Sequence, residues 1–274
     1  MKNRKELVQA MRQKMEEKKV IVVAGVDQLN HVRCCQEADC DLILLYPTSK
    51  YEKAKNRFLA GFLAFGNTNE MMQKVAGDIM PIVGGNNIIA GLNGSDPFKL
   101  DRILLKRMND NRFAGIHNYP PMALVDGIFE FNMSNLKLGF DEEVQLLKKA
   151  GEEGFYTVAM VRTSKQAILM ARANVDMIIF YLGLGEKENA QKQSKERRVT
   201  HDIEELKMLT ANVRKVARDI PLLFHSEHVS TVDERKMIME GVPEINGYCM
   251  LPVAKQHVEE SQLKLEIMQL KEGK

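Results

Sequence analysis

Eight short runs of apolar residues are spread along the chain, and they constrain its fold more than any other feature. Most of them are continuous in Val, Ile, Leu and Phe rather than alternating with polar residues. Strands that are buried on both faces have this composition, and such strands form parallel sheets. The runs are residues 20–24, 41–46, 88–92, 113–117, 155–161, 176–181, 221–225 and 245–250.

The segments between these runs carry helical patterns, and three of them begin with a residue pair that can cap a helix. These pairs are Asn67 with Glu70, Thr163 with Gln166, and Thr231 with Glu234. Strands that alternate regularly with helices favour a single (β/α)8 barrel, and a doubly wound open sheet is the alternative. We expect one domain over residues 1–274, with the barrel core at residues 20–252.

A helix is expected at each end of the barrel core. In the N-terminal helix, within residues 1–18, Leu7, Val8, Met11 and Met15 form one apolar stripe, which suits a lid over the closed end of the barrel or an oligomer contact. The C-terminal helix, residues 253–274, carries more apolar side chains than one barrel wall needs. Together the two helices predict a homo-oligomer.

Two connections depart from the minimal repeat. Residues 50–66 form an insertion before a helix, and residues 185–200 are rich in Lys, Glu, Gln and Arg. The second segment is interpreted as a loop at the barrel mouth, either a lid or a solvated run of charges. A solvated loop is favoured because charge runs usually face water. A helix with one apolar face is expected at residues 202–218.

Composition and charge exclude several classes of protein. The 274 residues are 45% hydrophobic and 28% charged, and the net charge of +2 leaves no basic stripe for a nucleic-acid partner. The chain shows neither a signal sequence nor an apolar run long enough to cross a bilayer, so we expect a cytoplasmic protein without a membrane partner. Its four Cys residues lack zinc-site spacing, which favours reduced thiols.

Functional side chains of such a barrel lie at the carboxyl ends of its strands. His117 and His225 each end a run, where an imidazole could act as acid or base or could bind a neighbouring loop. Arg162 could clamp a carboxylate or phosphate, or pair with an acid at the mouth. Asn93 and Asn118 could orient substrate or cap a helix, whereas turn chemistry alone accounts for Gly94.

Motifs of several enzyme classes are missing from the sequence. It contains no GxxxxGK[ST] phosphate loop, no GxGxxG after the first run, no GxSxG and no HExxH. Nucleotide hydrolysis, dinucleotide redox chemistry and serine hydrolysis are therefore disfavoured. Asp27, Asp96 and Glu227 are candidate ligands for Mg²⁺, although their spacing is not diagnostic of a metal site.

Four blocks in the first half of the chain resemble the phosphoenolpyruvate hydrolase-like family. These blocks are LAGFLAFGNTN at 59–69, AGLNGSDPF at 90–98, FAGIHNYP at 113–120, and DG at 126–127 with Asn132. The resemblance is strong over residues 40–150 and can be followed to about residue 260. It implies a TIM barrel, similar to indole-glycerol-phosphate synthase and grouped with pyruvate and phosphoenolpyruvate enzymes, that acts on a small phosphorylated acid or oxo-acid, with Mg²⁺ and often as an oligomer.

The resemblance places ten residues at matching positions. They are Gly61, Gly66, Asn67, Asn93, Gly94, Asp96, Asn118, Pro120, Asp126 and Gly127. The chain departs from the family pattern after the first, sixth, seventh and eighth runs. Side chains there replace glycines that would let backbone N–H groups approach a phosphate, and Glu227 adds a negative charge where an anion would rest.

We predict an enzyme of the hydrolase or lyase type that acts on phosphoenolpyruvate or a related small molecule. Catalytic roles are expected for His117, Asp96 and His225. Substrate-binding roles are expected for Asn93, Gly94, Asn118, Arg162, Gly183 and Glu227. The alternative is a repurposed barrel that serves as a sensor of a small ligand or as a structural or regulatory subunit.

Overall fold

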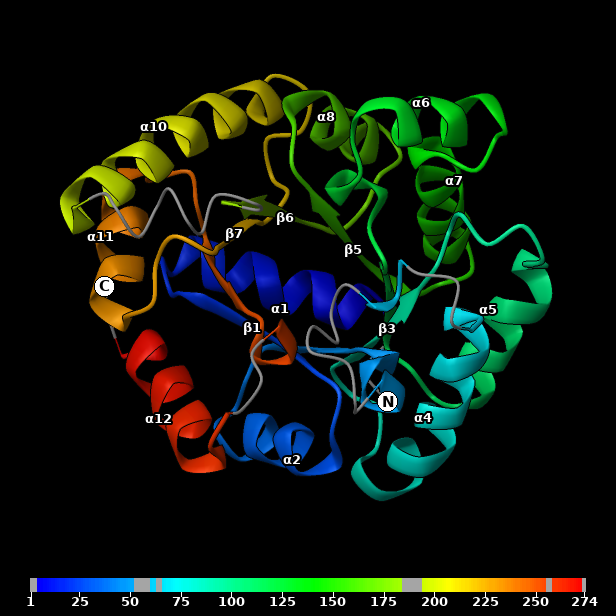
Figure 1. The fold of residues 1–274 in the computed structure, drawn as a ribbon. Coiled ribbons are helices and arrows are strands. Elements are labelled where there is room, and N and C mark those ends of the chain that lie inside the picture. The colour runs from blue at the N-terminus through cyan, green and yellow to red at the C-terminus, as the bar shows by residue number, and fades with distance from the viewer. Residues whose placement is uncertain (1–3, 52–59, 63–65, 184–193, 255–257, 273–274) are drawn as a thin grey trace.

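The computed structural model describes residues 4–51, 60–62, 66–183, 194–254 and 258–272. Its eight strands are parallel and form one closed barrel in the order β1 to β8, with β8 pairing back to β1 (Figure 1). The expected (β/α)8 barrel is confirmed, and the open-sheet alternative is wrong. The strands are β1 Ile21–Val26, β2 Leu42–Leu45, β3 Ile88–Leu92, β4 Gly115–Asn118, β5 Tyr156–Val161, β6 Met177–Leu182, β7 Leu222–Ser226 and β8 Gly247–Met250.

Helices surround this barrel. The α-helices are α1 Arg4–Glu16, α2 Leu29–Glu37, α4 Thr68–Val83, α5 Asp101–Asp110, α6 Gly127–Asn135, α7 Phe140–Glu152, α8 Ser164–Arg172, α10 Lys195–Arg214, α11 Val232–Gly241 and α12 Glu260–Lys271. Short 3₁₀ turns occur at η1 Pro47–Tyr51, η2 Met122–Leu124 and η3 Pro252–Ala254. None of the described helices is long and apolar enough to cross a bilayer.

Strand residues alternate between two apolar layers. In β2, Ile43 and Leu45 belong to the layer between barrel and helices, whereas Leu42 and Leu44 belong to the layer inside the barrel. Both sets are buried, which explains why the strands are continuously apolar in sequence. Because the inner layer is filled by side chains, function is confined to the ends of the barrel.

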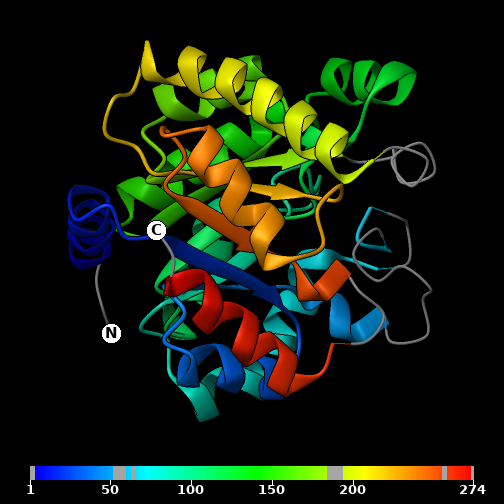
Figure 2. The same cartoon turned by 90° about the vertical axis from the view of Figure 1, so that its left-hand side faces the viewer.

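Helix α1 closes the amino-terminal end of the barrel. Leu7 and Met11 are buried in the inner apolar layer, and Figure 2 shows α1 beside the end at which the strands begin. Arg4 fixes the helix: its Nε donates to Asp176 Oδ2 at 2.9 Å, and its Nη1 donates to the Gly151 carbonyl at 2.8 Å. Of the two roles expected for this helix, these contacts support the lid.

The three predicted caps are present. Asn67 Oδ1 accepts from the Glu70 amide at 3.0 Å. Thr163 with Gln166 and Thr231 with Glu234 both form reciprocal capping boxes at the starts of α8 and α11. Each cap provides partners for backbone N–H groups that a helix start leaves unpaired. The caps therefore fix the points at which the loops after strands β5 and β7 end.

Two predicted boundaries are wrong. The helix expected at residues 202–218 begins at Lys195, where Ser194 caps it, so residues 195–200 belong to α10 and not to a charged loop. Residues 185–193 of that loop lie outside the described residues. The C-terminal helix begins at Glu260 and not at residue 253, because Glu259 has an extended backbone with φ −70° and ψ 133°.

Candidate active site at the carboxyl ends of the strands

Strands β6 and β7 place three polar side chains in a hydrogen-bonded array. Glu227 Oε1 accepts from the Tyr181 hydroxyl at 2.7 Å and lies 3.4 Å from His225 Nε2. His225 Nδ1 lies 2.9 Å from the Cys249 carbonyl oxygen. A carbonyl and a carboxylate can only accept, so the ring satisfies both contacts when both of its nitrogens carry a proton. The ring therefore lies between two hydrogen-bond acceptors, one at each of its nitrogens.

Tyr181 remains a neutral donor in this array. Burial, and then the neighbouring Glu227 carboxylate, raise the pKa of its phenol well above the ordinary value. Its ring lies 4.9 Å from the His225 ring, so the imidazole is packed on one side as well as hydrogen-bonded. The carboxylate is thus fixed by one neutral donor and one basic ring.

His225 and Glu227 open onto a cavity of about 270 Å³ between the ends of β7 and β8 and helices α11 and α12. Arg235 supplies a buried positive charge to this cavity. The residue is 3% exposed, and its guanidinium lies 4.8 Å from the centre of the Tyr248 ring. Its Nη1 donates to Glu266 at 3.0 Å and its Nη2 to the Ser230 carbonyl at 3.3 Å. Among the described residues, its Nε has no hydrogen-bond partner. A ligand in this cavity meets an acid–base pair and a guanidinium.

Asp96 and Asn93 are held in the loop after β3. Asp96 Oδ2 accepts from Asn67 at 2.8 Å and from Asn69 at 2.9 Å, while its Oδ1 accepts from the Phe98 amide. The Asn93 backbone exchanges two hydrogen bonds with the Asn69 side chain, and Asn93 Oδ1 accepts from the Ser95 amide. These contacts bind the loop to the start of α4. They favour a structural role for Asp96, and its catalytic role stays a prediction.

Asn118 and Gly94 both approach Glu143, a buried residue in the first turn of α7. Asn118 Nδ2 donates to Glu143 Oε2 at 2.8 Å, and the Met122 amide donates to Glu143 Oε1 at 2.6 Å. Burial nevertheless raises the pKa of Glu143 to about 8, so its carboxyl is largely protonated at neutral pH. A Cβ on Gly94 would lie 2.7 Å from Glu143 Cα, which explains the need for glycine there.

His117 lies on the inner face of β4, where its ring packs 4.7 Å from that of Tyr46. Burial lowers its pKa to about 4, so the imidazole is neutral at physiological pH. Neither ring nitrogen has a partner within hydrogen-bond geometry among the described residues. A neutral imidazole of this kind can donate to one ligand atom and accept from another. His117 therefore keeps a candidate role in the site.

Arg162 does not share the cavity of His225. It lines a separate groove of about 780 Å³ formed with η2, α6, α7 and α8. The positive charge beside His225 comes from Arg235. The proposed clamp role of Arg162 remains a prediction for the groove that it lines.

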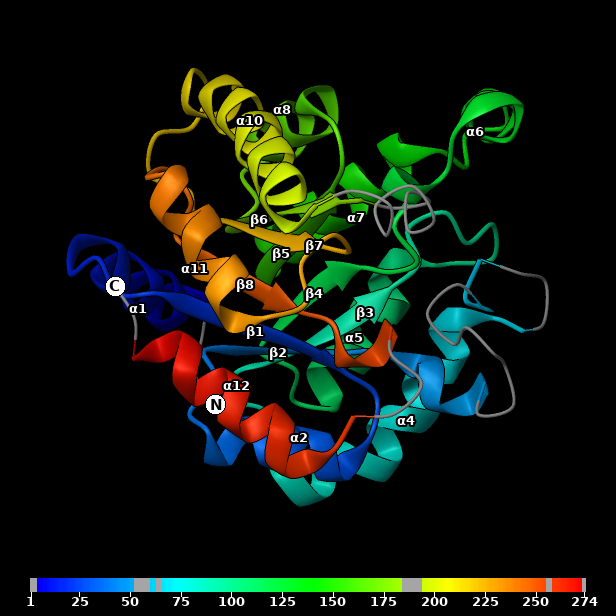
Figure 3. The same ribbon diagram turned by 60° about the vertical axis from the view of Figure 1, so that its left-hand side comes forward.

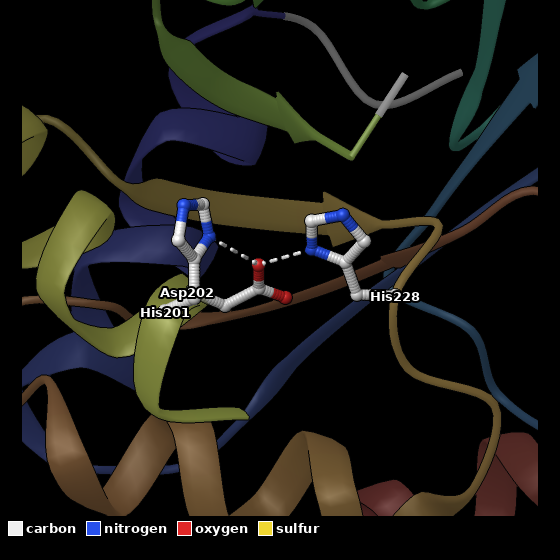
Figure 4. Close-up of side chains that lie close together, drawn as sticks. All are labelled: His201, Asp202 and His228. Atoms are coloured by element: carbon white, nitrogen blue, oxygen red, sulfur yellow. Dashed lines mark hydrogen bonds and ion pairs between the residues drawn. The ribbon is translucent and has the colours of Figure 1, made fainter. Parts of the chain in front are cut away.

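Helix α10 and the loop after β7 form a second polar cluster (Figure 4). Asp202 Oδ1 lies 2.7 Å from His228 Nδ1 and 3.8 Å from His201 Nδ1. Ser226 Oγ donates to the other Asp202 oxygen at 2.5 Å. Gly183, with φ +76°, lies against the His228 ring, and a Cβ there would be 2.8 Å from the ring. Only glycine suits this position, both for its backbone conformation and for space.

The described residues do not gather the three carboxylates that the sequence suggested as Mg²⁺ ligands into one group. Among them, the single group of three metal-binding side chains with ligand atoms within 4.8 Å of one another is His201, Asp202 and His228. Two of its three donors are nitrogen, whereas Mg²⁺ takes oxygen ligands in octahedral geometry. Asp96, Asp27 and Glu227, the candidate Mg²⁺ ligands from the sequence, do not converge in such a group. We therefore assign no step to Mg²⁺.

Residues 6–270 match the profile of the phosphoenolpyruvate hydrolase-like family. The chain belongs to this family. As a family member it is 25% identical over 245 residues to the tomato (Solanum lycopersicum) proteins "ToMV resistance protein Tm-1(GCR237)" and "ToMV susceptible protein tm-1(GCR26)". The match covers 88% of this chain and 32% of each tomato protein, so the chain spans about a third of the length of these relatives.

Two solved structures share the barrel fold of this family member. An oxaloacetate acetylhydrolase bound to oxalate matches with a TM-score of 0.55 at 14% identity, over 92% of this chain and 82% of its own. A 2,3-dimethylmalate lyase, described as a member of the PEP mutase/isocitrate lyase superfamily, matches with a TM-score of 0.52 at 13% identity, over 93% and 82% of the two chains. At these identities the likeness establishes the fold alone.

Sequence reasoning missed Arg235, Glu143, Asp202 and His228 as members of polar sites. Arg235, Glu143 and Asp202 lie on helices, whereas the candidate residues in the sequence follow the apolar runs expected to be strands. A buried charge on the face of a helix gives little signal in sequence, because it has the same spacing as an exposed one. His228 could have been predicted from sequence, because it follows the candidate residue Glu227 directly in the loop after β7.

Proposed function

We propose that this barrel is an enzyme of the hydrolase or lyase type that acts on phosphoenolpyruvate or a related small phosphorylated acid or oxo-acid. The observation that carries the proposal is the array of Tyr181, Glu227 and His225 at the edge of a cavity that also contains the Arg235 guanidinium. The small cavity and its buried guanidinium suit a compact anion better than a large ligand.

Each of these residues has a distinct part in the proposed reaction. Arg235 attracts the substrate carboxylate and is oriented for this by Tyr248 and Glu266. His225, as imidazolium, donates a proton to the substrate atom at which negative charge develops. Glu227 stabilises the charged ring, and the neutral Tyr181 phenol holds the Glu227 carboxylate.

In hydrolysis of phosphoenolpyruvate, water and the substrate would give phosphate and pyruvate. The oxygen of water joins phosphorus while the bond between phosphorus and the enol oxygen breaks. The methylene carbon then takes a proton from His225 to give pyruvate, and His225 regains a proton released from the water. In hydrolysis of an oxo-acid such as oxaloacetate, water would add to the 2-oxo carbon and the bond between C2 and C3 would break. The same imidazolium would protonate the enolate that leaves, and the proton released from the water would return to the imidazole. Two fold neighbours, the acetylhydrolase and the lyase, are named for reactions on small carboxylates, which supports this substrate class.

The test is product analysis with a small panel of substrates. Purified protein is incubated with phosphoenolpyruvate, oxaloacetate and 2-methylmalate, each with and without MgCl₂, and phosphate, pyruvate, oxalate and acetate are measured. We expect turnover of at least one compound that yields a stoichiometric pair of products. Absence of turnover across the panel and its three- to five-carbon analogues would reject the proposal.

A second candidate function is ligand binding without catalysis, as a sensor or as a regulatory subunit. It is favoured by the names of the tomato relatives, which describe virus resistance and susceptibility rather than an enzyme activity. Glu227 also places a carboxylate at the cavity, where its negative charge would repel a phosphate and weaken its binding. Thermal-shift screening separates the candidates: stabilisation by a metabolite that is not consumed favours the sensor, and stabilisation only by a protein favours the subunit.

A further inference from the structure

We infer that His201, Asp202 and His228 bind a late first-row transition ion of the Zn²⁺ type beside the end of β7. Helix α10 supplies the adjacent residues His201 and Asp202, and the loop after β7 supplies His228 (Figure 4). Both imidazoles lie near the same Asp202 oxygen, and the three ligand atoms lie within 4.8 Å of one another. None of the three lines the cavity of His225, so the inference does not rest on the proposed function.

The donor set selects the kind of ion. Two imidazole nitrogens and one carboxylate are ligands that Zn²⁺ takes at about 2.0–2.2 Å. At these bond lengths, ligand atoms of a tetrahedral site lie about 3.3 Å apart. The two distances from Asp202 Oδ1, 2.7 Å to His228 and 3.8 Å to His201, bracket this value. The three ligand atoms lie within 4.8 Å of one another, so a movement of the exposed His201 ring towards Asp202 and His228 would form the site.

Charge and hydrogen bonding also favour an ion here. The Asp202 side chain is fully buried, and a buried carboxylate is costly unless it is compensated. Ser226 Oγ donates to Asp202 Oδ2 and accepts from the His228 amide at 3.0 Å, so one hydroxyl orients both ligands. His201 is 55% exposed at its side chain, which leaves solvent access for a fourth ligand.

The test uses the full chain after chelator treatment and dialysis. Binding of ZnCl₂ and of MgCl₂ is measured by calorimetry, and CoCl₂ is added to read the visible absorption of a tetrahedral site. We expect one Zn²⁺ per chain, a Co²⁺ spectrum typical of nitrogen ligands, and no response to Mg²⁺. His201→Ala, which removes an exposed ligand and should fold normally, is expected to weaken Zn²⁺ binding at least tenfold.

The matched control is His31→Ala, which removes a half-buried imidazole on α2, on a different helix from the cluster. It should bind Zn²⁺ as the unaltered chain does. Equal affinity in the two variants would show adventitious binding and overturn the inference, as would a chain that binds no Zn²⁺ at all. Asp202→Asn provides a second variant that keeps the shape of the side chain, and we expect it to lose the Co²⁺ spectrum.

A second inference is carried by α6, which has no buried residue. Three large apolar side chains on it are 57–81% exposed, Ile128, Phe129 and Phe131, and Leu136, the residue directly after it, is 68% exposed. Figure 3 shows α6 standing out from the barrel. A short helix without a packed face is not stable by itself in water. We propose that the α6 face is covered by a second copy of this chain.

The exposed area supports this occupant. At about 150–250 Å² for a fully exposed aromatic side chain, the four residues present roughly 500 Å² of apolar surface in each copy. A standard interface buries about 800 Å² per partner, so this face would be most of the apolar centre of a two-fold dimer. The C-terminal helix buries Leu263, Ile267 and Leu270 against its own barrel, while Leu265 and Met268 are 54% and 44% exposed.

Light scattering after size exclusion at micromolar concentration tests the dimer. We expect the mass of two copies for the unaltered chain and of one copy for the double variant Phe129→Glu/Phe131→Glu. Leu265→Glu, at a residue of α12 that is 54% exposed, is the control and should remain a dimer. A monomeric wild-type chain, or dissociation by the α12 variant alone, would overturn the proposal.

Discussion

Asn118 and Glu143 share a hydrogen bond of 2.8 Å inside the protein although they are 25 positions apart in the chain. Asn118 also donates to the Met160 carbonyl at 3.0 Å and accepts from the Met160 amide at 2.7 Å, so its amide group cannot turn over. The pair thereby joins β4, β5 and the start of α7. A carboxyl group with a raised pKa is thus built into the wall that positions the loop after β4.

Glu143 should make the free energy of unfolding depend on pH. The pKa of Glu143 is about 8 in the folded chain and near 4.5 in the unfolded chain. Its contribution to the free energy of unfolding is therefore complete below pH 4.5 and is lost as the pH rises through 8. The loss is on the order of 5 kcal/mol between these limits. Urea denaturation at pH 5 and pH 8 measures this change in the free energy of unfolding. Glu143→Gln should be less stable than wild type at pH 5, but its free energy of unfolding should not decrease between the two pH values as that of wild type does. Parallel curves for the two proteins would contradict the account.

The titration of His117 should make the free energy of unfolding decrease as the pH is lowered, which is opposite to the effect of Glu143. The His117 pKa of about 4 is below the value of 6.5 for an unfolded imidazole, so its contribution is complete above pH 6.5 and is lost as pH falls towards 4. Nitrogen chemical shifts of its ring should report a neutral imidazole at pH 5. Relative to His117→Gln, wild type should lose about 2 kcal/mol between pH 7 and pH 5. A ring that protonates near pH 6.5 would show that water reaches it freely.

Gly94 and Gly77 form a matched pair of glycines. Gly94→Ala would place a methyl group 2.7 Å from the Glu143 backbone, which should cost about 1–3 kcal/mol because a strand loop and a helix must separate. Gly77 lies inside α4 with nothing within 4 Å of the corresponding position, so Gly77→Ala should stabilise the chain by about 0.5–1 kcal/mol. Thermal unfolding of both variants decides this, and equal shifts in melting temperature would be inconsistent with the packing described.

The barrel could be predicted from sequence because burial on both faces makes its strands apolar throughout. His225 and Glu227 were predicted as site residues for a related reason, since they end or closely follow the seventh run and the carboxyl ends of parallel strands meet at one face. Arg235 could not be found in this way: it lies on α11, and only the packing of that helix against β8 brings its guanidinium over Tyr248.

Other differences arise where local pattern and tertiary packing disagree. Helix α6 was not predicted because it lacks the buried stripe by which a helix is recognised. The charged residues 195–200 resemble a loop, yet the Ser194 cap and the buried Val199 place them in α10. Arg162 directly follows β5, as predicted. It lies in a groove lined by α6, α7 and α8 that is separate from the cavity of His225.

The most direct test of the account is the rate of substrate turnover by three proteins: wild type, His225→Gln and His31→Gln. Glutamine keeps a polar side chain but cannot carry the imidazolium that Glu227 holds. With melting temperatures matched, we predict that His225→Gln lowers kcat by about 10²–10⁴-fold while His31→Gln leaves it within about twofold of wild type. A His225→Gln protein that retains the wild-type rate would contradict the assignment of this array as the catalytic centre.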